Sequence, residues 1–194
     1  RGLGDVYKRQ KLYKAITLDV KFYEDVEKDK SLTNQAMMTV VIVSILQGFM
    51  IAGLAPIALL QGVLGSLVRW FLWAFFIAFV GTRILPEPET ESNTGELLRT
   101  LGFAYAPGVL IILKLFPIIN LLFIDTIVVL LQIATMTVAV RQALDFNSTV
   151  RAVGVCIVAF IVMVITLTLF IGFTAFFVGV AENAVSPTSD LIGA

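Results

Sequence analysis

The sequence contains no histidine and a single cysteine, Cys156, among its 194 residues. Without histidine, the chain lacks imidazole ligands for zinc or haem and the base of an intramembrane serine protease. One cysteine cannot form a disulfide within the chain, and the apolar run around Cys156 favours packing over reactivity. The chain contains neither a Walker loop nor a GxGxxG fingerprint. We therefore predict no catalytic residue, no bound metal, no cofactor and no enzymatic activity.

Charged residues are also scarce, because they make up 14% of the chain while hydrophobic residues make up 58%. Ordinary soluble domains carry about 25% charged residues, and a soluble domain of this length needs them to cover its outside. The composition therefore predicts an integral membrane protein whose surroundings are the lipid bilayer. The formal net charge is zero, and without a basic patch we expect no nucleic-acid partner.

The first ten residues, RGLGDVYKRQ, read differently from those that follow. They resemble a translated sequencing adapter, so we interpret residues 1–10 as an artefactual, non-native leader. No apolar stretch with a small-residue cleavage site precedes residue 31, so the sequence shows no cleaved signal peptide. Residues 11–34 are polar, and we predict that they form an N-terminal segment on the cytoplasmic side.

A short amphipathic helix is predicted within this segment. Phe22, Tyr23 and Val26 are placed for one face of a helix, and Asp19 is a suitable N-cap residue. A helix just before a membrane span is expected to lie in the interface, with its aromatic side chains facing lipid and its charges facing water. A solvated segment is the alternative.

Five apolar segments follow, four of them near the length of about 20 residues that crosses a bilayer as a helix, and the last one longer. Glycine and proline residues place a turn between the first two: Gly53, Pro56, Gly62 and Gly65. The predicted spans are 35–55, 64–84, 100–116, 118–140 and 150–180, within a transmembrane domain of residues 35–180 that precedes a polar tail, 181–194. The predicted fold class is all-α, an integral membrane bundle of about five helices preceded by the interfacial helix.

The third span is the shortest of the five. The stretch before it, PEPETESNTGE at 86–96, contains two prolines and four glutamates, which predict a loop. Asn93 and Glu96 have the spacing of a capping box for the helix that follows. Pro107 interrupts the apolar segment and predicts a kink. A four-span arrangement, with this segment re-entrant, is the alternative.

Lysine and arginine residues are distributed unequally between the loops. With five spans, only Lys114 lies on one side, and the other side holds the N-terminal segment and four loop arginines: Arg83, Arg99, Arg141 and Arg151. Five spans thus place twelve lysine and arginine residues on one side and one on the other, or nine and one without the first ten residues. With four spans, the count over the whole chain is ten against two. By the positive-inside rule, this distribution predicts a cytoplasmic N-terminus and an outside C-terminus.

Three segments near these loops carry a family resemblance: GTRIL at Gly81–Leu85, TGELLRTLGFAYAPG at Thr94–Gly108 and AVRQALDF at Ala139–Phe146. They resemble prokaryotic members of the YIP-domain family, named for Ypt- and Rab-interacting membrane proteins. The FYEDVEKD run before the first span is similar too, and the resemblance covers roughly residues 18–180.

The resemblance implies a bundle of about five transmembrane helices with a cytoplasmic N-terminus, in the cytoplasmic membrane of a prokaryote. Family members of the eukaryotic secretory pathway act in trafficking and membrane shaping without catalysis. The chain has no convincing DLYGP-type motif of that eukaryotic branch. Rab binding is therefore not implied.

Two charged residues fall inside predicted spans, where a charge is costly and usually faces a partner, a cavity or the interface. Arg69 lies five residues into the second predicted span and Asp125 seven into the fourth, so both fall in the outer half. The two side chains are a candidate intramembrane ion pair. Separate snorkelling to the interface and a site that binds or conducts a ligand are the alternatives.

The four loop arginines, Arg83, Arg99, Arg141 and Arg151, are candidate contacts for anionic lipid headgroups or for a protein partner on the cytoplasmic face. Topology alone is the simpler explanation, because the positive-inside rule requires such residues at the ends of spans in any protein of this kind.

Two classes of function follow from these observations. The resemblance favours a non-enzymatic scaffold or adaptor in membrane organisation or trafficking-like processes, with a protein partner bound through the N-terminal segment and loops. Arg69, Asp125 and the kinked third span favour a small transporter or channel subunit, although the two halves show no matching interrupted helices. Small residues four apart, such as Gly48 and Ala52, leave a homo-oligomer open without favouring it.

Overall fold

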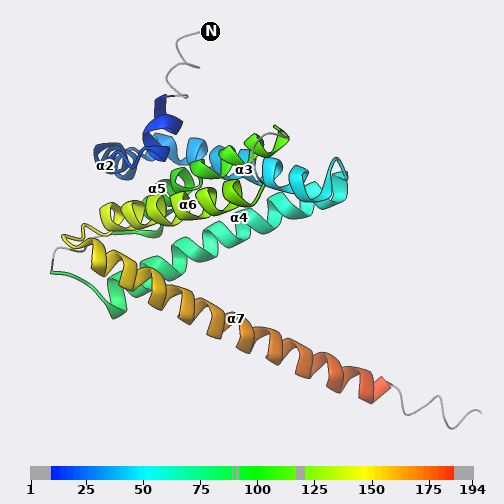
Figure 1. The fold of residues 1–194 in the computed structure, drawn as a ribbon. Helices are drawn as coiled ribbons and strands as arrows, with labels where there is room; N and C mark the ends of the chain where they lie inside the picture. The colour runs from blue at the N-terminus through cyan, green and yellow to red at the C-terminus, as the bar shows by residue number, and fades with distance from the viewer. Residues whose placement is uncertain (1–9, 89, 91, 117–120, 186–194) are drawn as a thin grey trace, which may run out of the picture. The chain divides into compact units, whose positions relative to one another are not determined.

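The computed structural model describes residues 10–88, 90, 92–116 and 121–185. Within these residues every regular element is a helix (Figure 1). Nine of the ten leader residues and most of the predicted polar tail lie outside the described residues. The chain divides into two units, Arg1–Ala159, which holds the helical bundle, and Phe160–Ala194, which includes the last helix from Phe160 to Val185.

Helix α2 (Val20–Lys28) is the predicted amphipathic helix. The Asp19 carboxylate accepts a hydrogen bond from the Phe22 amide at 3.1 Å, which confirms Asp19 as the N-cap residue. A 3₁₀ turn, η1 (Lys30–Leu32), leads directly into the first span. This short connection holds α2 close to the end of the bundle.

The apolar face of α2 packs against protein, which corrects the expectation that its aromatic side chains face lipid. Phe22 and Tyr23 are buried, and the Phe22 ring meets the Phe103 ring edge-on with centroids 5.3 Å apart. Helix α2 contacts α5 (Thr94–Ala104) and α6 (Leu121–Ala143). An amphipathic helix buries its apolar face against whatever apolar surface is within reach, and the short η1 places it at the bundle.

The first two spans form a helical hairpin. Helix α3 (Thr33–Ala52) ends at Gly53, whose φ of 63° lies in the left-handed region that glycine adopts without strain. Helix α4 (Pro56–Phe79) begins with Pro56, where the missing N–H costs nothing because the first turn has no acceptor for it. A π-helical turn, η2 (Val80–Ile84), completes the span.

The second span therefore starts eight residues earlier than the predicted boundary at residue 64, and that prediction was wrong. Gly62 and Gly65 lie inside α4 rather than in the turn. In an apolar environment the backbone has no water to bond with, so a glycine stays helical where the same residue would weaken a helix in water.

The third span begins with the predicted capping box. The Glu96 amide donates to Asn93 Oδ1 at 3.1 Å, and the Asn93 amide donates to Glu96 Oε2 at 3.0 Å. After Ala104 the α-helix gives way to a 3₁₀ helix, η3 (Ala106–Leu115). Near Pro107, where the sequence predicts a kink, the structure shows a change of helix type.

This broken span lies at the centre of the bundle, because α5 or η3 contacts α2, α3, α4 and α6. In the most apolar part of Thr94–Leu115, 56% of the residues are buried, compared with 28% in each of the first and fourth spans. Protein rather than lipid therefore surrounds the irregular backbone, which is the situation in which a membrane tolerates it.

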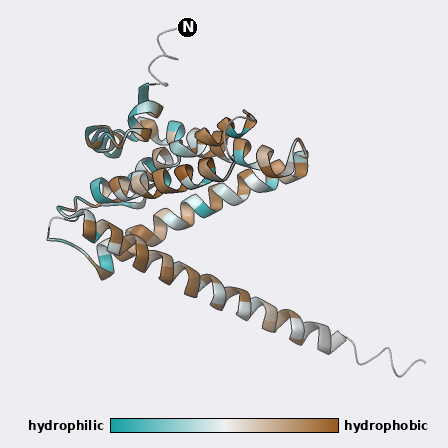
Figure 2. Cartoon of the chain, viewed as in Figure 1, coloured by the Kyte–Doolittle hydropathy of each residue, from teal (hydrophilic) through white to brown (hydrophobic). Residues whose placement is uncertain are grey.

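The fourth and fifth spans are α6 and α7 (Thr149–Val185). Five helices of the described chain are long and apolar enough to cross a membrane, which confirms the predicted number and the all-α fold. In Figure 2 hydrophobic residues dominate α3, α4 and α6, while hydrophilic residues gather on the N-terminal helices and the connecting loops. The protein is a multi-pass membrane protein.

Candidate functional site

The loop arginines gather at one end of the bundle, which we call the α2 end. It comprises α2, the start of α5, the loop after η2 and the turn between α6 and α7, and hydrogen bonds cross between all four. Three of the four arginines form hydrogen bonds within the protein there. These three arginines therefore stabilise the fold through hydrogen bonds within the protein.

Arg99 is buried, with only 5% of its surface exposed. Its Nε donates to the Val26 carbonyl at 3.1 Å, and its Nη2 donates to the Glu27 carbonyl. These carbonyls belong to the last turn of α2, where no backbone donor follows, and a positive charge there complements the helix dipole. Arg99 therefore fastens α2 to α5 and is not available to a lipid headgroup.

The Glu27 side chain lies close to this contact. Burial raises the pKa of its carboxyl from the ordinary 4.5 to about 7, and the charges of Asp145 and Glu96 act in the same direction. Lys28 and Arg99 act in the opposite direction. The folded protein holds this proton more tightly than the unfolded chain, so the stability it contributes is complete below pH 4.5 and is lost as the pH rises through about 7.

We expect the Glu27→Gln variant to lose this pH dependence, because its amide is neutral throughout. The carboxyl is partly exposed, and solvent screens its charge. At about pH 8 the variant should therefore have a free energy of unfolding about 1 kcal/mol higher than that of the wild type, or a thermal midpoint about 2–4 °C higher. Thermal unfolding in detergent at several pH values between about 5 and 8 measures this difference. Asp25→Asn, on the exposed face of α2, is the matched control. Parallel curves for Glu27→Gln and the wild type would contradict this role.

Arg141 closes the turn between α6 and α7. Its Nε donates to the Phe146 carbonyl at 3.1 Å, and its two Nη atoms donate to Thr149 Oγ1 at 3.2 Å and to the Asn147 carbonyl at 3.4 Å. Asp145 in this turn has a φ of 52°, a left-handed conformation that aspartate accepts more easily than most residues. The guanidinium thus holds a tight turn in place.

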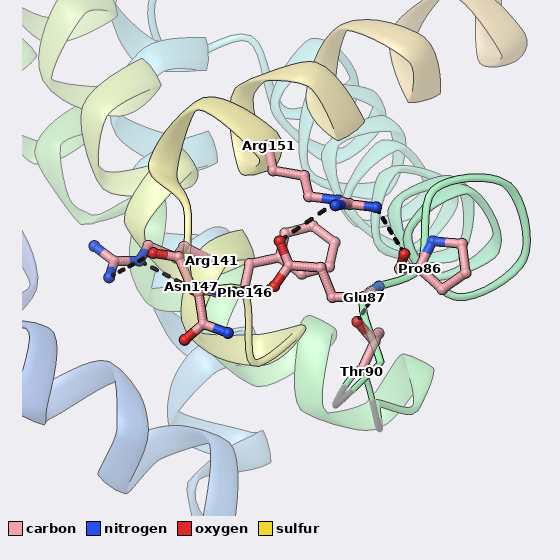
Figure 3. A network of polar contacts seen from close by, with 7 residues as sticks. All are labelled: Pro86, Glu87, Thr90, Arg141, Phe146, Asn147 and Arg151. Atoms are coloured by element: carbon pink, nitrogen blue, oxygen red, sulfur yellow. Dashed lines mark hydrogen bonds and ion pairs between the residues drawn. The ribbon is translucent and has the colours of Figure 1, made fainter.

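Glu87 connects this turn to the loop after η2 (Figure 3). Its Oε2 accepts a hydrogen bond from the Asn147 amide at 3.1 Å, and its Oε1 lies 3.5 Å from Arg151 Nε. Arg151 Nη2 also donates to the Pro86 carbonyl at 2.8 Å. Because the Glu87 side chain is only 9% exposed, this carboxylate belongs to the interior of the α2 end.

Arg83 is the remaining loop arginine. It lies in η2 and is exposed, and none of the residues that the structure describes gives it a hydrogen bond or an ion pair. Of the four predicted lipid or partner contacts, Arg83 is the one without an internal bond among the described residues. Arg99 is buried, whereas Arg151 forms internal bonds and still keeps 43% of its side chain exposed.

Asp125 pairs with Lys114 rather than with Arg69. Lys114 Nζ lies 2.9 Å from Oδ2 and 3.1 Å from Oδ1 of Asp125, at the end of the third and fourth spans remote from α2. The predicted pair between Arg69 and Asp125 was therefore wrong. The physical reason is axial position: Lys114 is near the end of η3 and Asp125 near the start of α6, whereas Arg69 lies far inside α4.

A double-mutant cycle measures this pair. Lys114→Gln and Asp125→Asn should each lower the thermal midpoint, and the double variant should lose less than the two losses added together, with a coupling of about 1 kcal/mol. The Asp125 side chain is 49% exposed, which keeps the expected coupling small. Strictly additive losses would show that the two side chains do not interact in solution.

Arg69 lies at the middle of its span rather than near one end. In the span Pro56–Ile84, it follows the first residue by thirteen positions and precedes the last by fifteen. Its Nη2 donates to Ser66 Oγ at 3.0 Å, one turn earlier on α4. In the part of the chain that the structure describes, no carboxylate forms an ion pair with Arg69.

A pocket of about 200 Å³ lies beside Arg69. The first four spans supply its lining: Gln47, Arg69, Ala104, Tyr105, Gln132 and Met136. Tyr105 and Gln132 lie, like Arg69, near the middle of their spans, Thr94–Leu115 and Phe123–Ala143. Trp73 Nε1 donates to Met136 Sδ at 3.0 Å and holds one wall. The structure thus places a polar pocket within the membrane-spanning part of the bundle.

The pocket adjoins the point where α5 changes into η3. The Gly108 amide donates to the Tyr105 carbonyl at 2.9 Å, and Pro107 has no N–H, so neither of these residues donates to the Ala104 carbonyl. Thr135 Oγ1 of α6 lies 2.9 Å from that carbonyl and 2.9 Å from the Leu131 carbonyl of its own helix, and it can donate to either. The break in the third span therefore has a hydroxyl donor from α6 within reach.

Gly108 lets the two glutamine side chains approach the backbone closely. A Cβ atom on Gly108 would lie 2.9 Å from Gln132 Nε2 and 3.3 Å from Gln47 Nε2, and 2.4 Å from a methyl carbon of Val43. Only glycine fits at such distances. The two carboxamides therefore converge on one side of the pocket.

Sequence reasoning did not identify Gln47, Tyr105 and Gln132. These side chains carry no charge, and hydropathy averaged over a span hides a single amide or hydroxyl. The sequence offered one signal, a glutamine in the middle of a span. An amide without a hydrogen-bond partner is costly in lipid, so such a residue indicates a polar neighbour or a cavity.

No protein-family model matches the chain, and no curated protein and no solved structure matches it either. The resemblance to the YIP-domain family therefore stays a prediction that depends on its short sequence segments. The function has to be inferred from the geometry of the α2 end and of the polar pocket.

Proposed function

We propose that the protein is a non-enzymatic multi-pass membrane protein of the YIP type that acts as a scaffold or adaptor in membrane organisation. The proposal places the α2 end on the cytoplasmic side of a prokaryotic cell membrane, in agreement with the positive-inside rule. The observation that carries it is the fastening of α2 to the bundle by Arg99, which turns the N-terminal segment into a fixed part of the protein surface.

The outer face of α2 is strongly charged and open to solvent. Its exposed charged side chains are Lys21, Glu24, Asp25 and Lys28, and Val20 is also exposed. The Glu24 carboxylate accepts a hydrogen bond from Gln142 Nε2 of α6 at 3.2 Å, which further limits the motion of the helix. A pre-ordered charged surface favours a protein partner, because binding then costs little conformational entropy and charge complementarity selects the partner.

Reversing the charges on this face tests the adaptor function. Affinity purification from native membranes with the wild type should recover a partner in stoichiometric amount, and a variant with Lys21→Glu, Asp25→Lys and Lys28→Glu should lose most of it. Lys30→Glu, an exposed charge outside α2, is the control and should retain the partner. Equal recovery by the triple variant, or no stoichiometric partner at all, would overturn the proposal.

A second candidate function is a small transporter or channel subunit. The specific observation in its favour is the pocket beside Arg69 at the break of the third span, since interrupted helices in transporters surround binding sites near the middle of the bilayer. Asp125 does not line this pocket, so the candidate depends on Arg69 alone. Arg69→Gln separates the two functions: an adaptor retains its partner in this variant, whereas a transporter loses solute uptake into proteoliposomes.

A further inference from the structure

Among the described residues, the lining of the polar pocket contains a positive charge and no acidic side chain. A guanidinium in the middle of a span is costly unless a partner accepts its hydrogen bonds. Arg69 has five N–H donors, and the bond to Ser66 Oγ uses one of its terminal nitrogens. The Arg69 side chain is exposed, and its other donors have no acceptor among the described residues.

The other polar side chains of the pocket add donors to the same space. The amide nitrogens of Gln47 and Gln132 converge near Gly108, and the Tyr105 hydroxyl can also donate. Ala104 and Met136 form the apolar part of the lining. A ligand that fits has an acceptor-rich, negatively charged end and a small apolar end.

We propose that this pocket binds a carboxylate, with its two oxygens on the Arg69 guanidinium and on the carboxamides, and with its first carbons against Met136. Arginine and a carboxylate match in a two-pronged geometry, which makes this pair stronger and more specific than a point charge would be. A volume of about 200 Å³ is below the 300–1,000 Å³ typical of drug-sized ligands. It fits a carboxylate head with a few carbons.

This ligand class names the solute of the second candidate function and does not depend on the adaptor function. Binding in detergent and uptake into proteoliposomes are measured separately. Binding without uptake would support the carboxylate site and contradict only the transport function. Absence of binding would contradict both, because uptake requires the site.

Ligand-induced stabilisation of the purified protein in a neutral detergent is the first test. Butyrate should raise the thermal midpoint in a saturable way at constant ionic strength, because a ligand that binds only the folded state stabilises it. Butyramide, which has the same shape without the charge, should have no such effect. Arg69→Gln should weaken the response at least tenfold in half-saturating concentration, while Arg83→Gln, an arginine outside the pocket, should respond as the wild type does.

A second variant keeps the test decisive if Arg69→Gln fails to fold. Gln132→Glu places a carboxylate of the protein itself in the pocket. This variant should be at least as stable as the wild type without ligand and should no longer respond to butyrate. A wild type that responds equally to butyrate and butyramide, or a Gln132→Glu variant that responds to butyrate as the wild type does, would overturn the proposal.

The source of the carboxylate is read from a chain-length series of acetate, butyrate, hexanoate and octanoate, each below the concentration at which it forms micelles. Strongest binding by the short members would assign a small carboxylate that enters from water. Affinity that rises with every added carbon would assign a fatty acid that enters from the bilayer. Both results support the carboxylate site, and the absence of binding by every member contradicts it.

Discussion

Replacing Arg99 by glutamine is expected to release α2 from the bundle. The guanidinium donates to two carbonyls of the last turn of α2, and hydrogen bonds from a charged donor contribute about 1.5–3 kcal/mol each. Glutamine is shorter and can replace at most one of them, so we expect a loss of about 3 kcal/mol, a hundredfold increase in the opening of α2. Hydrogen exchange of the α2 amides and the thermal midpoint, with an expected fall of about 6–12 °C, measure the effect.

Two further variants make this result specific. Arg99→Lys keeps the charge but not the fork that reaches two carbonyls at once, so its loss should lie between those of the glutamine variant and the wild type. Arg83→Gln removes an exposed arginine from η2 and should leave α2 protected. If the α2 amides exchange equally slowly in Arg99→Gln and in the wild type, Arg99 does not fasten the helix.

Gly102→Ala is expected to destabilise the bundle by about 3 kcal/mol, at the upper end of the cost of overpacking. A Cβ atom on Gly102 would lie 2.7 Å from the Ala36 Cβ and 3.0 Å from the Ala36 backbone carbon and oxygen. The neighbour is mostly backbone and cannot rotate away, so α3 and α5 must separate. Because α5 lies at the centre of the bundle, the separation disturbs its other contacts too. The thermal midpoint should fall by about 6–12 °C.

Gly62→Ala is the matched control for this variant. No atom of the described residues lies within 4 Å of the position that its Cβ would take, and alanine is at least as good a helix former as glycine. The control should therefore equal or exceed the wild type in stability. A Gly102→Ala protein that gains stability as the control does would show that α3 and α5 do not approach each other as closely as described.

Several features of the fold could be predicted from the sequence because they depend on residues close together in the chain. The N-cap at Asp19 and the capping box of Asn93 and Glu96 involve side chains three residues from the amides they bind. The number of spans depends on hydropathy summed along each helix, which needs no knowledge of neighbours. The interruption near Pro107 follows from the missing N–H of proline.

The partners of the charged and polar side chains could not be predicted in this way. Arg99 binds carbonyls more than seventy residues away, and Asp125 binds Lys114 rather than Arg69. A hydrogen bond between helices requires two side chains at the same height and on facing sides. An error of eight residues in the start of α4 displaces Arg69 by about 12 Å along the helix axis, enough to move it from near one surface to the middle of the span.

The sequence by itself thus determined that this chain is a multi-pass membrane protein with five apolar helices, because insertion depends on composition and on the length of apolar runs. Only the tertiary structure decided that the apolar face of α2 packs against α5 and α6, and that Arg69 meets Gln47, Tyr105 and Gln132 at one pocket. Those contacts depend on the rotation and axial offset of each helix, which are decided by packing between helices, and packing joins residues that hydropathy treats as independent.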